Sequence, residues 1–281
     1  MKIGVPTEIH PDEKRVAATP ETVESFIDDG YRVVVESDAG AAADFPDDAY
    51  REAGAEIADD REAVWEAAEI VVKVRPPAEA PDGEAHEADL LGEGDILISL
   101  LWPAQNEELL DRIRDRGATA FALDCVPRIT RAQSMDVLSS MAGIAGYRAV
   151  VEAANEFGRF FSAQMTAAGS SPPAQALVIG AGVAGLQAVA TAREMGAIVY
   201  AFDTREAVRE EVESLGGRFL ELEFDESGEG EGGYAKEMSE AFIEAERELF
   251  AEQAAETDVI ITTASVPGKP APKLVMEEAV E

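Results

Sequence analysis

The chain has 281 residues, of which 46% are hydrophobic and 28% charged, so it is long enough for two globular domains with separate cores. Its 57 acidic and 23 basic residues give a formal charge of −34, which excludes nucleic acid and anionic membrane surfaces as electrostatic partners. The single cysteine excludes an intrachain disulfide, and no apolar run reaches the ~18 residues of a membrane span. We therefore expect a cytoplasmic protein with no direct membrane insertion and no nucleic-acid partner.

The first part of the chain alternates strand-like and helical patterns. Short apolar runs predict strands at 2–5, 33–36, 70–74, 96–101 and 119–123, and helical patterns occur at 20–29, 47–53, 61–67 and 106–116. Such alternation is typical of a mostly parallel sheet covered by helices. We therefore expect an N-terminal α/β domain over residues 1–135, with a polar surface loop at 76–94.

A single long helix is predicted for residues 136–161, because apolar side chains recur there at steps of three and four residues. Gly143 and Gly146 weaken this helix but permit close approach by another element. We interpret residues 136–165 as a helical connection between two α/β domains. A cofactor would then lie in the cleft between the domains.

Residues 166–281 are predicted to form the second α/β domain. The expected elements are strands at 177–179, 198–202, 219–223 and 258–263, and helices at about 183–195, 205–215 and 236–255. The polar, glycine-rich segment 225–233 is expected to be mobile, with Tyr234 as the group able to dock. The proline-rich loop 266–272 is expected at the ligand edge of the sheet.

The most informative motif is GAGVAG at residues 180–185, which follows one predicted strand and opens a helix. Gly180 would allow a sharp turn, Gly182 would let the backbone approach a pyrophosphate, and Gly185 would let the helix pack closely on the strand. The N–H groups at the start of the helix would face the phosphates. This context favours a dinucleotide site over an ordinary turn.

Asp203 follows the next predicted strand, 23 residues after Gly180, near the spacing expected for the acidic residue of a dinucleotide site. Its carboxylate would accept hydrogen bonds from the adenosine ribose and repel a 2′-phosphate, which predicts NAD(H) rather than NADP(H). Arg205 is close enough to reduce this preference, but we interpret it as a surface partner of the acid.

No pair of a nucleophile and a base, no HExxH motif and no cluster with metal-ligand spacing is visible in the sequence, so no metal site is expected. A dehydrogenase acting on an alcohol or amine must move a proton as well as a hydride, which requires a positioned acid or base. Direct transfer between two nicotinamide rings moves only the hydride and requires alignment at about 3–3.5 Å.

A polar group that could align a nicotinamide precedes the long helix. Arg128, Gln133 and Asp136 could hold a carboxamide and its ribose through complementary donors and acceptors. The alternative is a solvated loop in which Asp136 or Ser134 caps the helix. The spacing alone leaves both interpretations open.

Seven segments resemble one known family: RVAATPETV (15–23), LWPAQN (101–106), PRITRAQSMD (127–136), SSMAGIAGYRAVVEAANEFGRFF (139–161), VIGAGVAGLQA (178–188), GGYAKEM (232–238) and PGKPAPKL (267–274). They are similar to the NAD(H)-binding domain I, in the alpha subunit, of proton-translocating NAD(P) transhydrogenase, within the alanine dehydrogenase/transhydrogenase superfamily. The resemblance covers nearly the whole chain. It implies two Rossmann-like domains with mostly parallel sheets.

The resemblance also implies which residues bind NAD(H). Arg128, Gln133 and Asp136 would lie against the nicotinamide and its ribose as the catalytic group. The glycine turn would hold the pyrophosphate, Asp203 the adenosine ribose, and the segment carrying Tyr234 would close over the nucleotide. The implied cofactor-binding residues are Arg128, Gln133, Asp136, Ser139, Gly180, Gly182, Val183, Gly185, Asp203, Thr204, Arg205, Gly233, Tyr234, Ala235 and Ala264.

For activity, the resemblance implies direct, Si-specific hydride transfer between NAD(H) on this chain and NADP(H) on a partner domain III, coupled to proton translocation by a membrane domain II. The chain would be a homodimer in the cytoplasm, peripheral to the inner face of the cell membrane through its partner subunits. It stops at Glu281 within a predicted helix, whereas the family continues, so we expect a truncated second domain.

Two alternatives stay open. Alanine dehydrogenase is one, because Arg15 and Lys73 stand where that family binds the substrate carboxylate, although no histidine occupies residues 102–105, where its catalytic histidine would fall. A non-catalytic NAD-binding subunit is the other, because the sequence shows neither an NADP site nor a membrane span.

The acidic residues are spread along the whole chain, which argues against an acidic interaction tail. We interpret them as an adaptation to a high-salt cytoplasm, where screening shortens to a few Å and self-repulsion fades. Unfolding followed from low to molar KCl tests this hypothesis, with a rise in stability expected. A free energy of unfolding that is indifferent to salt would contradict it.

Overall fold

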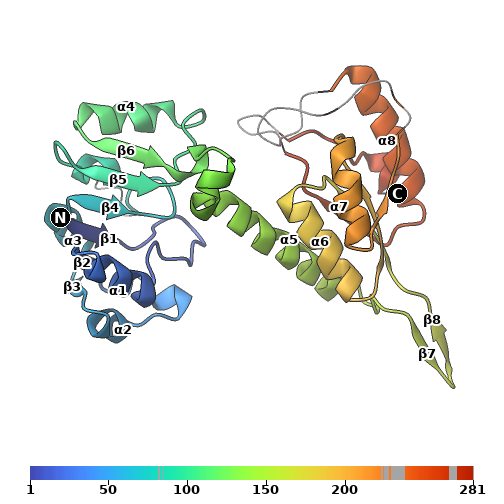
Figure 1. Ribbon diagram of the computed structural model, residues 1–281, viewed down its shortest axis with the longest axis horizontal. Coiled ribbons are helices and arrows are strands. Elements are labelled where there is room, and N and C mark those ends of the chain that lie inside the picture. The colour runs from blue at the N-terminus through green and yellow to red at the C-terminus, as the bar shows by residue number, and fades with distance from the viewer. Residues whose placement is uncertain are drawn as a thin grey trace. The chain divides into compact units, whose positions relative to one another are not determined.

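The computed structural model describes residues 1–81, 83, 85–222, 224, 228, 238–265 and 271–280. The chain divides into two compact units, Met1–Val126 and Pro127–Glu281, each built on a parallel sheet with helices (Figure 1). The predicted α/β class with two Rossmann-like, parallel sheets is confirmed. Among the described residues, no helix combines the length and the apolar character needed to cross a lipid bilayer.

The first unit contains a six-stranded sheet in the order β3-β2-β1-β4-β5-β6, with every neighbouring pair parallel. Its strands are β1 (Lys2–Val5), β2 (Arg32–Glu36), β3 (Glu56–Ala58), β4 (Ile70–Val72), β5 (Ile96–Ser99) and β6 (Thr119–Ala122). Its helices are α1 (Pro20–Asp28), α2 (Asp47–Glu52), α3 (Arg61–Ala67) and α4 (Glu107–Asp115), with 3-10 turns at Ala41–Ala43, Glu87–Leu90 and Leu123–Cys125. This is the doubly wound strand order.

Apolar strand residues of the first unit are buried in two clusters. Val5 and Val35 pack with α1 and α2, and Leu97 belongs to the second cluster, which includes residues of α3 and α4. α1 begins as the sequence predicts, because the Thr19 side chain caps it and Pro20 occupies its first turn.

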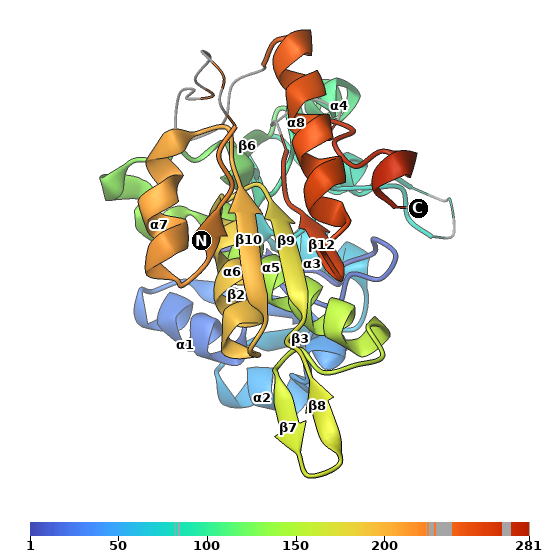
Figure 2. The ribbon, with the colours of Figure 1, turned by 90° about the vertical axis from the view of Figure 1, so that its right-hand side faces the viewer.

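The second unit contains a four-stranded parallel sheet in the order β11-β10-β9-β12. Figure 2 shows β10, β9 and β12 side by side. Its strands are β9 (Gln175–Ile179), β10 (Ile198–Phe202), β11 (Arg218–Phe219) and β12 (Val259–Thr262). Its helices are α5 (Val137–Glu156), α6 (Val183–Glu194), α7 (Arg209–Ser214) and α8 (Glu240–Ala254), with 3-10 turns at Thr130–Met135, Glu206–Val208 and Glu277–Ala279. A separate antiparallel hairpin joins β7 (Gln164–Thr166) to β8 (Gly169–Ser171).

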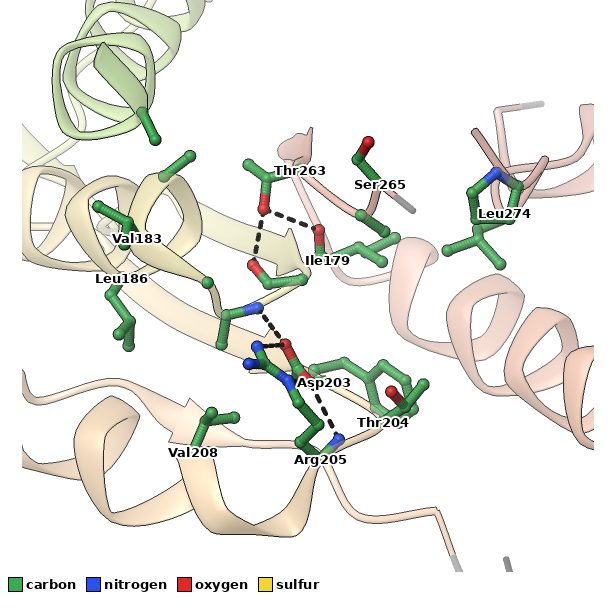
Figure 3. Close-up of a pocket in the computed structure, with 18 of the residues that line it drawn as sticks. Ile179, Val183, Leu186, Asp203, Thr204, Arg205, Val208, Thr263, Ser265 and Leu274 are labelled. Carbon is green, nitrogen blue, oxygen red and sulfur yellow. Dashed lines mark hydrogen bonds and ion pairs between the residues drawn. The ribbon is translucent and has the colours of Figure 1, made fainter. Parts of the chain in front are cut away.

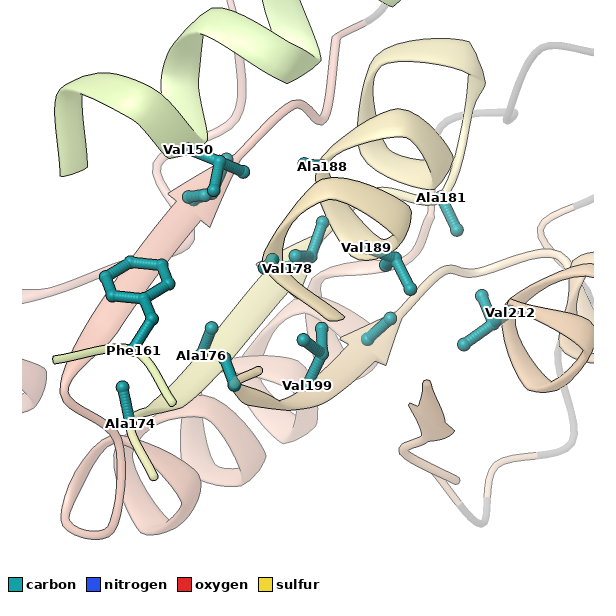
Figure 4. Close-up of a cluster of buried hydrophobic side chains, with 14 of the residues drawn as sticks. Val150, Phe161, Ala174, Ala176, Val178, Ala181, Ala188, Val189, Val199 and Val212 are labelled. Atoms are coloured by element: carbon teal, nitrogen blue, oxygen red, sulfur yellow. The ribbon is translucent and has the colours of Figure 1, made fainter. Parts of the chain in front are cut away.

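The central strand of this sheet, β9, is buried on both faces. Ala176 and Val178 pack in a cluster with residues of α5 and α6 (Figure 4), whereas Leu177 and Ile179 pack in another cluster with Phe250 of α8. A continuous apolar run is what a parallel strand covered on both faces requires. The helices on the two faces therefore fix β9 and the glycine turn that follows it.

Helix α5 is shorter than predicted. It ends at Glu156 rather than at residue 161, because Gly158 adopts a φ of +62°, in the left-handed region that commonly terminates helices. α5 packs along α6 at Gly146, where an added Cβ would overlap the carbonyl oxygen of Ala184. The predicted close approach to another element is therefore observed at Gly146.

Several short elements differ from the sequence-based expectation. β3, β7 and β8 are not predicted, and residues 163–170 around the hairpin are exposed, so they lack any apolar alternation to detect. β11 is limited to two residues, and α8 begins at Glu240 because Ser239 caps it. The expected mobile segment 225–233 and the loop 266–272 lie mostly outside the described residues.

The contact at Gly146 predicts opposite effects for two substitutions in α5. Gly146→Ala should lower the free energy of unfolding by about 1–3 kcal/mol, because the new methyl group forces α5 away from α6. Gly143→Ala should raise it by up to about 1 kcal/mol, because no atom lies within 4 Å of the added Cβ and alanine favours the helix. Urea unfolding at fixed salt measures both, and equal effects would contradict the close packing.

Candidate functional site

A cavity of about 690 Å³ lies at the carboxyl edge of the sheet in the second unit. It is lined by residues 179–184 at the end of β9 and the start of α6, 202–205 at the end of β10 and 263–265 after β12 (Figure 3). Side chains of α5, α7 and α8 complete the lining. β9 and β12 are the neighbours at which the strand order reverses, which is where open α/β sheets bind ligands. Its volume falls in the range of small-molecule sites.

The three glycines of the turn have three different environments. Gly180 has a φ of +93°, a backbone conformation that other residues rarely adopt, and its carbonyl accepts a hydrogen bond of 2.8 Å from the Thr263 hydroxyl. A Cβ on Gly185 would overlap that same carbonyl, so α6 packs directly on the end of β9. A Cβ on Gly182 would meet nothing within 4 Å. The turn is therefore tight on its inner side and open at Gly182.

Helix α6 presents its N-terminus at the cavity. It begins at Val183, and no side chain caps it at Gly182. The first N–H groups of a helix have no partners within the helix, and they carry its positive dipole end. An anionic group such as a pyrophosphate fits this position.

Asp203 and Arg205 form a tight pair in the cavity wall (Figure 3). The Arg205 side chain donates to both carboxylate oxygens of Asp203 at 2.8 Å, and the backbone N–H groups of Ala181 and Arg205 donate at 2.7 and 2.9 Å. Both side chains are largely buried, since that of Asp203 is 6% exposed and that of Arg205 is 16% exposed. Arg205 therefore pairs with Asp203 as expected, but its side chain lies largely buried in the cavity wall rather than on the open surface.

A third charged residue of the cavity, Glu246 of α8, is missed by the sequence-based analysis. It is 3% exposed, and its carboxyl group makes no hydrogen bond or ion pair with any described residue. Burial, and secondly the charge of Asp203, raise the pKa of Glu246 to about 7. A sequence signal existed, because Glu246 lies four residues from both Phe242 and Phe250, on the apolar face of the helix.

The structure brings together some, but not all, of the polar residues predicted before α5. Asp136 caps the helix: its carboxylate accepts from the Ser139 N–H at 2.9 Å and from the Ser139 hydroxyl at 2.6 Å. These bonds lower the pKa of Asp136. Arg128 donates to the Ser139 hydroxyl at 3.3 Å, and both residues line the cavity. Gln133 lies on the 3-10 turn, is exposed, and is not among the lining residues.

The remaining predicted site residues fall into two groups. Val183, Thr204 and Ala264 line the cavity, and the Thr204 hydroxyl is buried without a hydrogen-bond partner in the part of the chain that is described. Gly233, Tyr234 and Ala235 lie outside the described residues.

In the first unit the strand order reverses between β1 and β4, and buried charged side chains of the chain occupy this position. The Lys73 ammonium, directly after β4, lies 3.0 Å from the Glu87 carboxylate and 3.4 Å from that of Glu8, with all three side chains buried. Arg15 is paired with Glu13 at 2.6 Å, and this pairing lowers the pKa of Glu13 to about 2. The alanine dehydrogenase alternative assigns Arg15 and Lys73 to a substrate carboxylate. In this structure each of these cations is paired with carboxylates of the chain itself.

Fold and site define a two-unit α/β protein whose second sheet ends in a glycine turn that opens on a cavity of about 690 Å³. The N-terminal and C-terminal domain models of "Alanine dehydrogenase/PNT" match residues 4–145 and 149–281. The chain belongs to the alanine dehydrogenase/PNT family.

The known relatives include transhydrogenase subunits and alanine dehydrogenases. "NAD(P) transhydrogenase subunit alpha" of Cereibacter sphaeroides is 54% identical over the whole chain, which spans 53% of that relative. Alanine dehydrogenase of Mycolicibacterium smegmatis is 30% identical, with 69% of its length covered. The solved transhydrogenase from Sinorhizobium meliloti is 40% identical and superposes with a TM-score of 0.84 over the whole chain and 74% of its own. The chain thus spans about half the length of the transhydrogenase alpha subunits of Cereibacter sphaeroides and Haemophilus influenzae.

Proposed function

We propose that this chain is the NAD(H)-binding component of a proton-translocating transhydrogenase, and that the cavity of the second unit is its NAD(H) site. The observation that carries the proposal is the turn at Gly182, which leaves room for a ligand beside the uncapped N-terminus of α6. The higher identity to the transhydrogenase subunit, 54% against 30%, supports the choice within the family.

The cavity residues fit a dinucleotide along its length. Backbone N–H groups at Gly182 and Val183 would hold the pyrophosphate, and the wall at Asp203 would receive the adenosine ribose. Arg128 and Ser139, with Asp136 fixing Ser139, would hold the carboxamide end. Bound NAD(H) supplies the hydride chemistry, and the residues of the chain bind and orient it.

The described lining residues also fit direct hydride transfer. They include no histidine, lysine, tyrosine or cysteine, and Glu246 interacts with Asp203 at the proposed adenosine end. In the first unit, Lys73 and Arg15 are occupied by carboxylates of the chain, which disfavours an amino-acid substrate there. Alignment of two nicotinamide rings requires no proton-handling side chain.

The partners follow from this assignment. The subunit names of the relatives indicate an enzyme of several subunits. We propose that this chain acts as a homodimer, with NADP(H) on a separate domain III and proton translocation through a membrane domain II, at the inner face of the cell membrane. Gln133 and the segment 233–235 would complete the site when both nucleotides are bound, and the position of the cofactor between the two domains stays a prediction.

The open position of Gly182 predicts a selective loss of binding. Gly182→Ala should weaken NADH binding by about tenfold or more, because the methyl group would separate the backbone donors from the pyrophosphate. The free energy of unfolding without nucleotide should be unchanged, since the added Cβ meets no atom of the chain. Gly143→Ala, which lies outside the cavity lining, is the control, and unchanged NADH affinity in Gly182→Ala would count against the site.

Isotope transfer tests the reaction itself. With NADH deuterated at its transferable position and an NADP(H)-binding domain III carrying NADP⁺, the label should appear in NADPH and none in water, because the transfer is direct. The chain without domain III should give no product. Reduction of NAD⁺ by this chain with L-alanine would instead establish an amino-acid dehydrogenase.

A further inference from the structure

The hydrogen-bonding capacity of Asp203 is fully used within the chain. A carboxylate has about four acceptor positions. Four N–H donors already fill them: three from Arg205, at 2.8 to 2.9 Å, and one from Ala181 at 2.7 Å. A ribose hydroxyl could bond to Asp203 only by displacing one of these donors.

The charge of Asp203 is also compensated. Arg205 lies against it in a two-pronged ion pair in which both side chains are largely buried. Arginine is a favourable partner for a phosphate group. The Asp203–Arg205 pair alone therefore rejects a 2′-phosphate less strongly than a lone carboxylate would.

Among the described residues that line the cavity, Glu246 is the buried carboxyl group that keeps its acceptor capacity, whereas Glu211 is exposed. The other acids of α8 at positions 240, 244, 248 and 252 are exposed, whereas Glu246 is buried beside the cavity without a partner among the described residues. Burying an unpartnered carboxyl group costs stability, which a structural role alone does not explain. The other charged groups on the described cavity wall are Arg128, Asp203, Arg205 and Glu211, and Arg247 neighbours Glu246 on α8.

We propose that Glu246 is a specificity-determining residue of the adenosine subsite: it accepts a hydrogen bond from a ribose hydroxyl and provides the buried negative charge that excludes a 2′-phosphate. This inference rests on the proposed function, because it takes the cavity to be the NAD(H) site. Asp203 then serves mainly to hold the glycine turn and Arg205 in place.

The test compares Glu246→Gln with Glu244→Gln. Glu244 lies on the same helix but on its exposed side, where its side chain is 69% exposed. NADH and NADPH are titrated separately by calorimetry at pH 8, where Glu246, with a pKa of about 7, is ionised. Glu246→Gln should weaken NADH binding by about tenfold and strengthen NADPH binding, because a neutral amide is a weaker acceptor and no longer repels phosphate. Glu244→Gln should change neither affinity.

Thermal unfolding without nucleotide gives a second readout. Glu246→Gln should match or exceed the wild-type melting temperature, because the substitution removes a buried charge and keeps its shape. A lower melting temperature with an unchanged NADH-to-NADPH preference would show a structural role and overturn the inference. If the wild-type chain prefers NADH and Glu246→Gln keeps that preference, only the role of Glu246 fails. If the wild-type chain binds neither nucleotide, the proposed function fails with it.

Discussion

The close contact between Gly185 and the carbonyl of Gly180 is the constraint on which the second unit depends. It allows α6 to start directly on the end of β9, so that the helix N-terminus opens at the sheet edge. The Thr263 hydroxyl fixes the same carbonyl from β12, and Asp203 fixes the Ala181 N–H from β10. Three strand ends thus position one turn, and that turn shapes the cavity.

The two units show how one strand order can serve two purposes. In the first unit the crossing between β1 and β4 is closed by the buried group Glu8, Lys73 and Glu87. In the second unit the crossing between β9 and β12 is left open, and the polar groups there line a cavity. The difference lies in the side chains after the strands, which is why the fold alone does not locate the site.

The sequence predicted the features that depend on local pattern. Strands such as β9 and the glycine turn follow from apolar runs and fixed spacing, and the cap at Thr19 follows from residue type. One tertiary contact, the close approach at Gly146, was also predicted, but other features set by tertiary packing were not. The exposed hairpin has no apolar periodicity, and the burial of Arg205 and Glu246 depends on how α8 and the segment after β10 fold around the cavity. Asp136 shows the intermediate case, since the sequence left open whether it caps a helix, and it does.

Amide hydrogen exchange with and without NADH tests the central claim most directly, because it reports on each backbone donor of the turn. NADH should slow the exchange of amides in residues 182–185, at the start of α6, and leave those of β1 and β4 in the first unit unchanged. Exchange in residues 182–185 that is the same with saturating NADH as without it would contradict the assignment of this cavity.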